Sequence, residues 1–186
     1  ESRILNVLPM HHVDGLIRGP LAALWCGGTV VRPHRFDVSK VQSLLSAVAA
    51  ERTTHLVAVP AMLDIINRLG DPSPEPFSAP AFRFVISSAD LLDEKLWNTF
   101  ETRFKTIIVN AYGLSEVVCD ALFCGPGADT RLVGSLGKPV GCQARVINGE
   151  GQDCRDEETG ERILSGPTVM QGYSRQPEET ARALRD

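Results

Sequence analysis

Thr106-Ile-Ile-Val109, followed directly by Asn110-Ala-Tyr-Gly-Leu-Ser-Glu116, is the stretch that decides the fold of this 186-residue chain. A β-branched run that breaks into polar residues is typical of a buried strand leading into a loop. In open α/β sheets, ligands collect outside such carboxyl ends. The ring of Tyr112 can stack on a planar base, the hydroxyl of Ser115 can contact a phosphate, and the carboxylate of Glu116 suits a hard cation such as magnesium. The loop is therefore a candidate nucleotide-phosphate site.

The same residues also fit an ordinary connection between a strand and a helix. Ser115 would then be the N-cap of the helix, and Glu116 would be favoured by the helix dipole. The loop alone is compatible with both interpretations.

Composition indicates a globular protein, because 43% of the residues are hydrophobic and 23% are charged. A net charge of -4 argues against nucleic acid as a partner, and no Lys/Arg run suggests a membrane surface. No apolar stretch reaches the roughly 18 residues that a membrane-spanning helix needs. The five cysteines form no Cys-x-x-Cys pair, which favours reduced thiols in a cytoplasm over disulfides or a zinc site.

Strands and helices alternate along the first two thirds of the chain. Apolar runs predict strands at 3–8, 29–31, 55–59, 82–86 and 106–109, and helical spacing predicts helices at 15–25 and 37–51, after Pro60, and around Phe100. This alternation predicts an α/β fold, a doubly wound and mostly parallel sheet with helices on both faces. Glycine then becomes frequent and helical spacing is lost, so we expect an α/β subdomain over 1–125 and a small β-rich portion over 126–186.

Polar residues follow three of the predicted strands. His11-His12 comes after the first, Ser87-Ser88 after the fourth, and the loop 112–116 after the fifth. Because the carboxyl ends of parallel strands meet at one edge of the sheet, we expect these segments to line a common crevice. Two alternatives remain open: His12 could cap the helix that starts near Gly15, and the serines could satisfy loop backbone.

Several motifs resemble the adenylate-forming superfamily of acyl-CoA synthetases, luciferases and peptide-synthetase adenylation domains. Tyr112 to Glu116 resembles the family motif Tyr-Gly-x-Thr/Ser-Glu, and Leu8 to Gly15 is similar to Pro-x-x-His-x-x-Gly. The resemblance continues, in the family's order, through Gly134–Pro139, Gly160–Pro167, Gly172-Tyr173 and Pro177–Thr180.

The resemblance implies an acid–thiol ligase. In that reaction a carboxylate attacks the α-phosphate of ATP, giving an acyl-AMP that is transferred to coenzyme A. By resemblance, His12, Ser115 and Glu116 would be catalytic, Tyr112 would stack on adenine, and Glu116 would bind Mg²⁺. The residues that would line the nucleotide site are Ser87, Ser88, Ala89, Asn110, Ala111, Tyr112 and Gly113.

His12 stands near the position where peptide-synthetase domains carry an Asp that holds an amino group, which favours an acyl or aryl acid as the substrate, as in fatty acid metabolism. The alternatives are an adenylation domain that loads a carrier-protein phosphopantetheine and, in another class, a non-catalytic α/β binding module.

Further family motifs are expected outside this chain. By the resemblance, a phosphate loop should precede residue 1, and a ribose-binding Asp motif should follow Asp186. We therefore expect a central fragment of the large N-terminal domain whose partners include the remaining parts of its own parent chain. We expect that alone it neither adenylates an acid nor forms a thioester.

Overall fold

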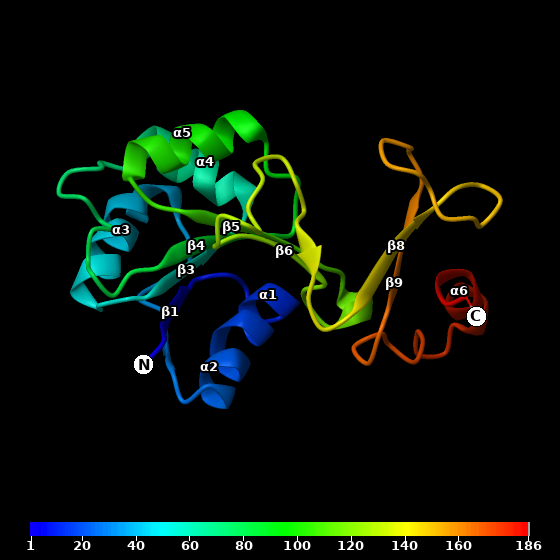
Figure 1. The fold of residues 1–186 in the computed structure, drawn as a ribbon. Coiled ribbons are helices and arrows are strands. Elements are labelled where there is room, and N and C mark those ends of the chain that lie inside the picture. Colours follow the sequence, from blue (N-terminus) through cyan, green and yellow to red (C-terminus); the bar gives the residue numbers. More distant parts are fainter. Residues whose placement is uncertain (186) are drawn as a thin grey trace.

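A computed structural model describes residues 1–185 and shows a seven-stranded sheet with helices packed on it (Figure 1). The strand order is β2-β1-β3-β4-β5-β6-β7. The strands are β1 (Arg3–Asn6), β2 (Thr29–Val31), β3 (His55–Ala58), β4 (Phe84–Ser87), β5 (Ile108–Tyr112), β6 (Leu122–Cys124) and β7 (Lys138–Pro139). Strands β1 to β5 pair in parallel, whereas β6 and β7 are antiparallel. The predicted mostly parallel α/β sheet is confirmed.

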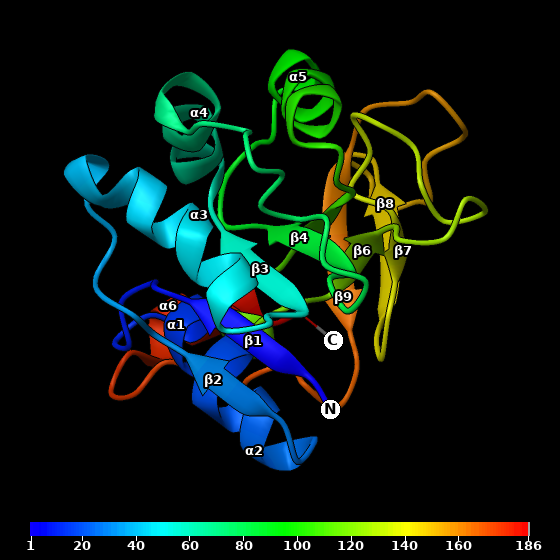
Figure 2. The same ribbon diagram turned by 90° about the vertical axis from the view of Figure 1, so that its left-hand side faces the viewer.

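Helices cover both faces of the sheet (Figure 2). One face carries α3 (Val41–Ala50), α4 (Pro60–Leu69) and α5 (Glu94–Phe104), and the other face carries α1 (Val13–Leu16) and α2 (Ala22–Trp25). Short 3₁₀ segments lie at Val38–Lys40 and Ser115–Val117. No helix within residues 1–185 is both long enough and apolar enough to cross a membrane.

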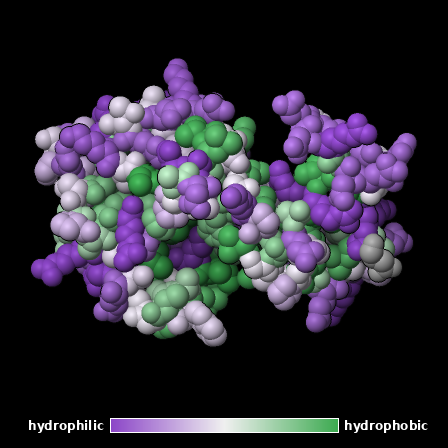
Figure 3. All heavy atoms as spheres, in the orientation of Figure 1, coloured by the Kyte–Doolittle hydropathy of each residue, from purple (hydrophilic) through white to green (hydrophobic). Residues whose placement is uncertain are grey.

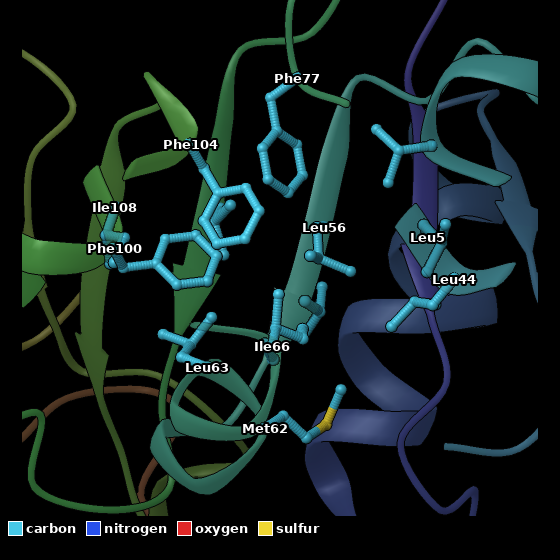
Figure 4. Packing of buried hydrophobic residues seen from close by; sticks show 14 of the residues in the cluster. Leu5, Leu44, Leu56, Met62, Leu63, Ile66, Phe77, Phe100, Phe104 and Ile108 are labelled. Atoms are coloured by element: carbon cyan, nitrogen blue, oxygen red, sulfur yellow. The ribbon is translucent and has the colours of Figure 1, made fainter. Parts of the chain in front are cut away.

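The main core lies between the sheet and the layer formed by α3, α4 and α5 (Figure 4). Helical spacing along α5 places Phe100 and Phe104 on this face, and both rings are buried. Their ring centroids lie 4.7 Å apart, and Phe77 from the preceding loop packs against both. Leu56 of β3 completes this apolar layer with no exposed surface.

The segment expected as one helix over 15–25 is broken. Helix α1 continues into a π-helical turn, Ile17–Leu21, before α2 begins. Gly19 lies at φ -103° and ψ -112°, outside the helical region, and Pro20 has no N–H to donate. The apolar pattern predicted the position of this segment correctly, but the prediction of a single regular helix was wrong.

Strand β5 is displaced from the expected 106–109. Asn110, Ala111 and Tyr112 belong to the strand because they pair with Cys124, Phe123 and Leu122 of β6. The pairing partner lies on the far side of the loop in sequence, so the polar residues 110–112 extend the strand instead of ending it.

A smaller part follows the sheet. It contains the hairpin β8 (Gln143–Ile147) and β9 (Glu161–Ser165) and then α6 (Pro177–Ala183). Apolar side chains fill its junction with the sheet, and hydrophobic atoms are visible there between the two bodies (Figure 3). The predicted β-rich texture is present, although the large sheet extends to Pro139 before the hairpin begins. The division at residue 125 stays a prediction, and the final residue of the helix expected over 177–186 lies outside the described residues.

Replacing Phe100 with Ala should lower the free energy of unfolding by about 3–5 kcal/mol, because the removed ring leaves a cavity in a close-packed core. Leu69 of α4 is 59% exposed, so Leu69→Ala is a matched control that should cost less than about 1 kcal/mol. Urea unfolding followed by circular dichroism measures both. Equal losses for the two variants would contradict the assignment of the core.

Candidate functional site

The polar segments expected to share one edge of the sheet do share it. His12 follows β1, Ser88 follows β4, and the loop 113–120 follows β5, all at carboxyl ends of parallel strands. Contacts made by Asp14 of α1 and by Arg18 of the π-helical turn after it then connect these segments. The shared edge is therefore a feature of the structure, and it brings together residues up to 102 positions apart. A common crevice stays a prediction, because the cavity at Tyr112 and Glu116 is bordered by the hairpin part and not by His12 or Ser88.

A buried ionic cluster makes these connections. The Arg18 guanidinium donates through Nε to Asp120 Oδ2 at 2.7 Å, and its NH1 lies 3.0 Å from Asp14 Oδ1. The same guanidinium also bonds Ser88, whose hydroxyl donates to Asp14 Oδ1 at 3.1 Å. Arg18 is only 7% exposed and Asp14 4%. The ends of β1, β4 and β5 are thus held by one guanidinium.

His12 has the capping role, which is one of the two alternatives for this residue. It is the N-cap residue of α1, and its Nδ1 accepts a hydrogen bond from the Asp14 amide at 3.2 Å. The same Nδ1 lies 3.2 Å from the Asp14 carboxylate. The imidazole is nevertheless 52% exposed, so one side of the ring faces the open edge. A site role for His12 stays a prediction alongside the observed cap.

The residues expected on the nucleotide side lie at the ends of β4 and β5. Ser87 and Ser88 are buried, and Ala89 takes a left-handed backbone conformation with φ at 70°. The Ser87 hydroxyl has no hydrogen-bond partner among residues 1–185. Asn110 is buried and donates to the Ser135 carbonyl at 3.1 Å, and Ala111 is buried beside it within β5. An unpaired buried hydroxyl is uncommon in folded proteins and marks this end of β4 as a polar site.

The loop after β5 is tight. A Cβ atom on Gly113 would lie 1.4 Å from the Cys119 carbonyl oxygen, so only glycine fits there. The 3₁₀ turn Ser115–Val117 starts behind Leu114, with no side-chain cap. The alternative in which Ser115 is an N-cap is therefore wrong. Ser115 is exposed to solvent in this loop.

Residues of the hairpin part hold the other side of this loop. The Tyr173 hydroxyl donates to Glu116 Oε1 at 2.6 Å, and the Met170 amide donates to the Glu116 carbonyl at 2.7 Å. The Arg162 guanidinium lies 4.5 Å from the centroid of the Tyr112 ring, which is a cation–π contact. A cavity of about 450 Å³ between the loop and the hairpin is lined by these side chains.

Hydrogen bonding shifts the acid–base behaviour of this pair. The bond from Tyr173, together with the backbone amide of Glu116, lowers the pKa of the Glu116 carboxyl. The same bond raises the pKa of Tyr173. Glu116 is therefore a carboxylate at neutral pH, and Tyr173 is a neutral donor.

Asp14, Arg18 and Asp120 were not among the candidate site residues. Arg18 interrupts an apolar segment four residues after Asp14, and this i, i+4 spacing of opposite charges could have indicated an ion pair. No local signal relates Arg18 to Asp120, because that contact depends on the assembled sheet.

Comparison with known proteins identifies the family. Residues 1–174 match the AMP-binding enzyme family. The chain belongs to this family. It is 34% identical to the sulfoacetate–CoA ligase of Cupriavidus necator over 98% of this chain and 35% of that protein. It is 30% identical to the indoleacetate–CoA ligase of Aromatoleum aromaticum over 100% of this chain and 36% of that protein.

Solved structures of the family share the fold. ATP-bound MatB from Rhodopseudomonas palustris superimposes with a TM-score of 0.86 at 24% identity, over 100% of this chain and 36% of that chain. The AMP complex of o-succinylbenzoate coenzyme A synthetase from Bacillus subtilis gives 0.83 at 25% identity, again over 100% of this chain and 36% of that one. This AMP-binding family chain therefore spans about a third of the length of the relatives it matches.

Replacing Arg18 with Ala should lower the free energy of unfolding by about 3–5 kcal/mol, because it leaves the Asp14 and Asp120 carboxylates, which are largely buried, without the cation they share. The control is Arg68→Ala, which breaks an exposed i, i+4 pair with Asp64 and should cost less than about 1 kcal/mol. Chemical denaturation of both variants measures the difference. Similar losses would show that the buried cluster does not stabilise this edge.

Tyr173→Phe should raise the pKa of Glu116 toward the ordinary glutamate value, because the hydroxyl that stabilises the carboxylate is gone. Stability from this bond is present above the unfolded-state pKa and is lost as pH falls through the lowered folded-state pKa. The stability difference between the two proteins should therefore shrink in acid. Carbon NMR titration of the Glu116 carboxyl measures the shift, and an unchanged titration midpoint would contradict the assigned cause.

Proposed function

We propose that this chain is part of a longer ATP-dependent ligase that activates a carboxylic acid as an acyl-AMP and transfers the acyl group to coenzyme A. The observation that carries the proposal is the position of the Tyr112 to Glu116 loop at the carboxyl end of β5, the edge of the sheet at which Arg18 joins Asp14, Ser88 and Asp120. Membership of the AMP-binding enzyme family and relatives named as CoA ligases support the same reaction.

The loop has side chains suited to ATP. Arg162 lies over the Tyr112 ring, and this partly exposed ring is proposed to stack on adenine. Ser115 is exposed at the loop tip, where its hydroxyl can donate to a phosphate oxygen. The residues lining the rest of the nucleotide site are proposed to be Ser87, Ser88, Ala89, Asn110, Ala111 and Gly113, and the unpaired Ser87 hydroxyl fits a polar ligand there.

Glu116 fits magnesium through one hard oxygen ligand. Its carboxyl is ionised at neutral pH, and the hydrogen bond from Tyr173 lowers its pKa below the ordinary value. Within residues 1–185 no group of three or more His, Cys, Asp or Glu residues converges on a metal position. Phosphate and water oxygens would therefore complete the shell, as is usual for magnesium at nucleotides. When bound, the ion would neutralise charge on the phosphates.

His12 and the buried cluster position the acid side of the crevice. The Asp14 amide holds the His12 ring through its hydrogen bond to Nδ1 at 3.2 Å, while half of the ring remains exposed. We therefore propose that the His12 imidazole lies at the boundary between the acid and the thiol, as the family resemblance implies. Catalysis here depends on orienting the reacting groups, which is the contribution that a rigid edge supplies.

We also propose that residues 1–125 form the α/β subdomain, residues 126–186 begin a β-rich one, and the parent enzyme works in the cytoplasm. Five free cysteines support a reducing compartment. Fatty, aryl and short-chain acids are all open as substrates, and a carrier-protein phosphopantetheine is the alternative acceptor.

The test uses the full-length protein that contains this chain. Pyrophosphate exchange into ATP should occur with at least one acid from a panel of fatty, aryl and short-chain acids, and Glu116→Ala should lower it at least about 100-fold. Glu161 lines the same cavity but pairs with Arg185 at the surface, so Glu161→Ala should retain activity within about twofold.

Residues 1–186 alone should show no exchange. A full-length protein that is inactive with every acid would support a non-catalytic binding module instead. Activity that requires a carrier protein in the second step would identify the alternative acceptor.

A further inference from the structure

Residues of the hairpin part contact two side chains at the end of β5, those of Tyr112 and Glu116. Tyr173 bonds one oxygen of the Glu116 carboxylate, and Arg162 covers one face of the Tyr112 ring. Arg162 and Tyr173, which make these contacts, lie more than 45 positions further along the chain, in β9 and after it. The contacts are therefore tertiary and cannot form before the hairpin has docked.

We propose that Tyr173 is a positioning residue that orients the Glu116 carboxylate for a divalent cation bound with ATP. This inference rests on the proposed function, because it gives Glu116 its cation. Tyr173 itself does not touch the reacting atoms. It acts through Glu116 by fixing which carboxylate oxygen is engaged by protein and which side of the group faces the crevice.

The geometry of Glu116 explains why it needs such a partner. The residue sits in a three-residue 3₁₀ turn that lacks a side-chain cap. Val118, directly after this turn, lies at φ 72°, so no regular helix continues to fix the side chains. A glutamate in such a turn has several rotamers, and ordering them at the moment of cation binding would lower affinity. The hydroxyl of Tyr173 selects one arrangement in advance.

Tyr173 is itself firmly placed. Its backbone amide donates to Thr180 Oγ1 at 2.9 Å, and that hydroxyl donates in turn to the Gln176 carbonyl at 2.8 Å. Three residues earlier, the Met170 amide holds the Glu116 carbonyl at 2.7 Å. The segment 170–173 therefore forms hydrogen bonds with both the backbone and the side chain of Glu116. Groups that orient a metal ligand in this way commonly change metal affinity by about 10–100-fold when removed.

A purely structural role for Tyr173 predicts a different result. If the hydroxyl only fastened the hairpin to the sheet, its loss would weaken ATP binding equally with and without the cation. If it positions Glu116, the loss appears only when the cation is present. The quantity that separates the two is the ratio of the ATP dissociation constant measured in chelator to that measured with Mg²⁺.

The experiment measures this ratio by titration calorimetry on the full-length protein. Tyr173→Phe should lower the ratio about tenfold and leave the dissociation constant in chelator unchanged within about twofold. Arg145→Gln is the matched control, because it removes an exposed ion pair with Asp153 in the hairpin part, away from the bonds that hold Tyr173 and Glu116. It should leave the ratio as in the wild type.

A double variant tests whether Tyr173 acts through Glu116. Because Tyr173 acts through Glu116, adding Tyr173→Phe to Glu116→Gln should lower the ratio no further than Glu116→Gln alone. A further loss in the double variant would overturn the inference, as would an equal weakening with and without Mg²⁺, or no change in Tyr173→Phe. These outcomes leave the proposed function intact, whereas a wild-type protein that binds no ATP under either condition would overturn both.

Discussion

The Arg18 guanidinium is the interaction on which the arrangement of the site depends. It is buried between Asp14 and Asp120, and it also bonds Ser88, so it ties the segments after β1, β4 and β5 to each other. A guanidinium is suited to this because its planar donors can serve several acceptors at fixed angles and it stays charged when buried. The parallel sheet brings the strand ends to one edge, and Arg18 sets how the loops at that edge lie.

Much of the fold could be predicted from local pattern. The spacing of Leu44, Leu45 and Val48 identifies α3, and the apolar runs identify the parallel strands, because burial of one face imposes a period on the sequence. The extent of β5 could not be read in this way. Tyr112 lies in the strand only because Leu122 pairs with it, which is a tertiary contact that overrides local preference. The break at Gly19 has a local cause, because Pro20 directly after it has no N–H to donate to a regular helix.

The residues of the site also fall into those that local sequence predicts and those that depend on tertiary contacts. Tyr112, Ser115 and Glu116 could be selected from sequence because residue type and a strand end coincide. Their supports could not, since Asp120 and Tyr173 act across 102 and 57 residues respectively. A partner in an ion pair or hydrogen bond leaves no periodic pattern in the sequence. In sequence, a buried and paired Arg within an apolar segment looks the same as an exposed Arg that merely interrupts the apolar run. Family resemblance supplied roles for the loop and no partners for it.

The loop belongs to two bodies at once, and this has a physical consequence. Its start is strand β5 of the large sheet, fixed by pairing on both sides, whereas its Glu116 is held by residues 170–173 beyond the hairpin. The junction between the two bodies is a small apolar cluster around Val117 and Leu122, which is less extensive than the main core. Elements with few buried contacts open at lower free energy than a packed core does. The hairpin is therefore the part whose motion would release Glu116 while Tyr112 stays in the sheet, and the bond from Tyr173 couples the carboxylate to that motion.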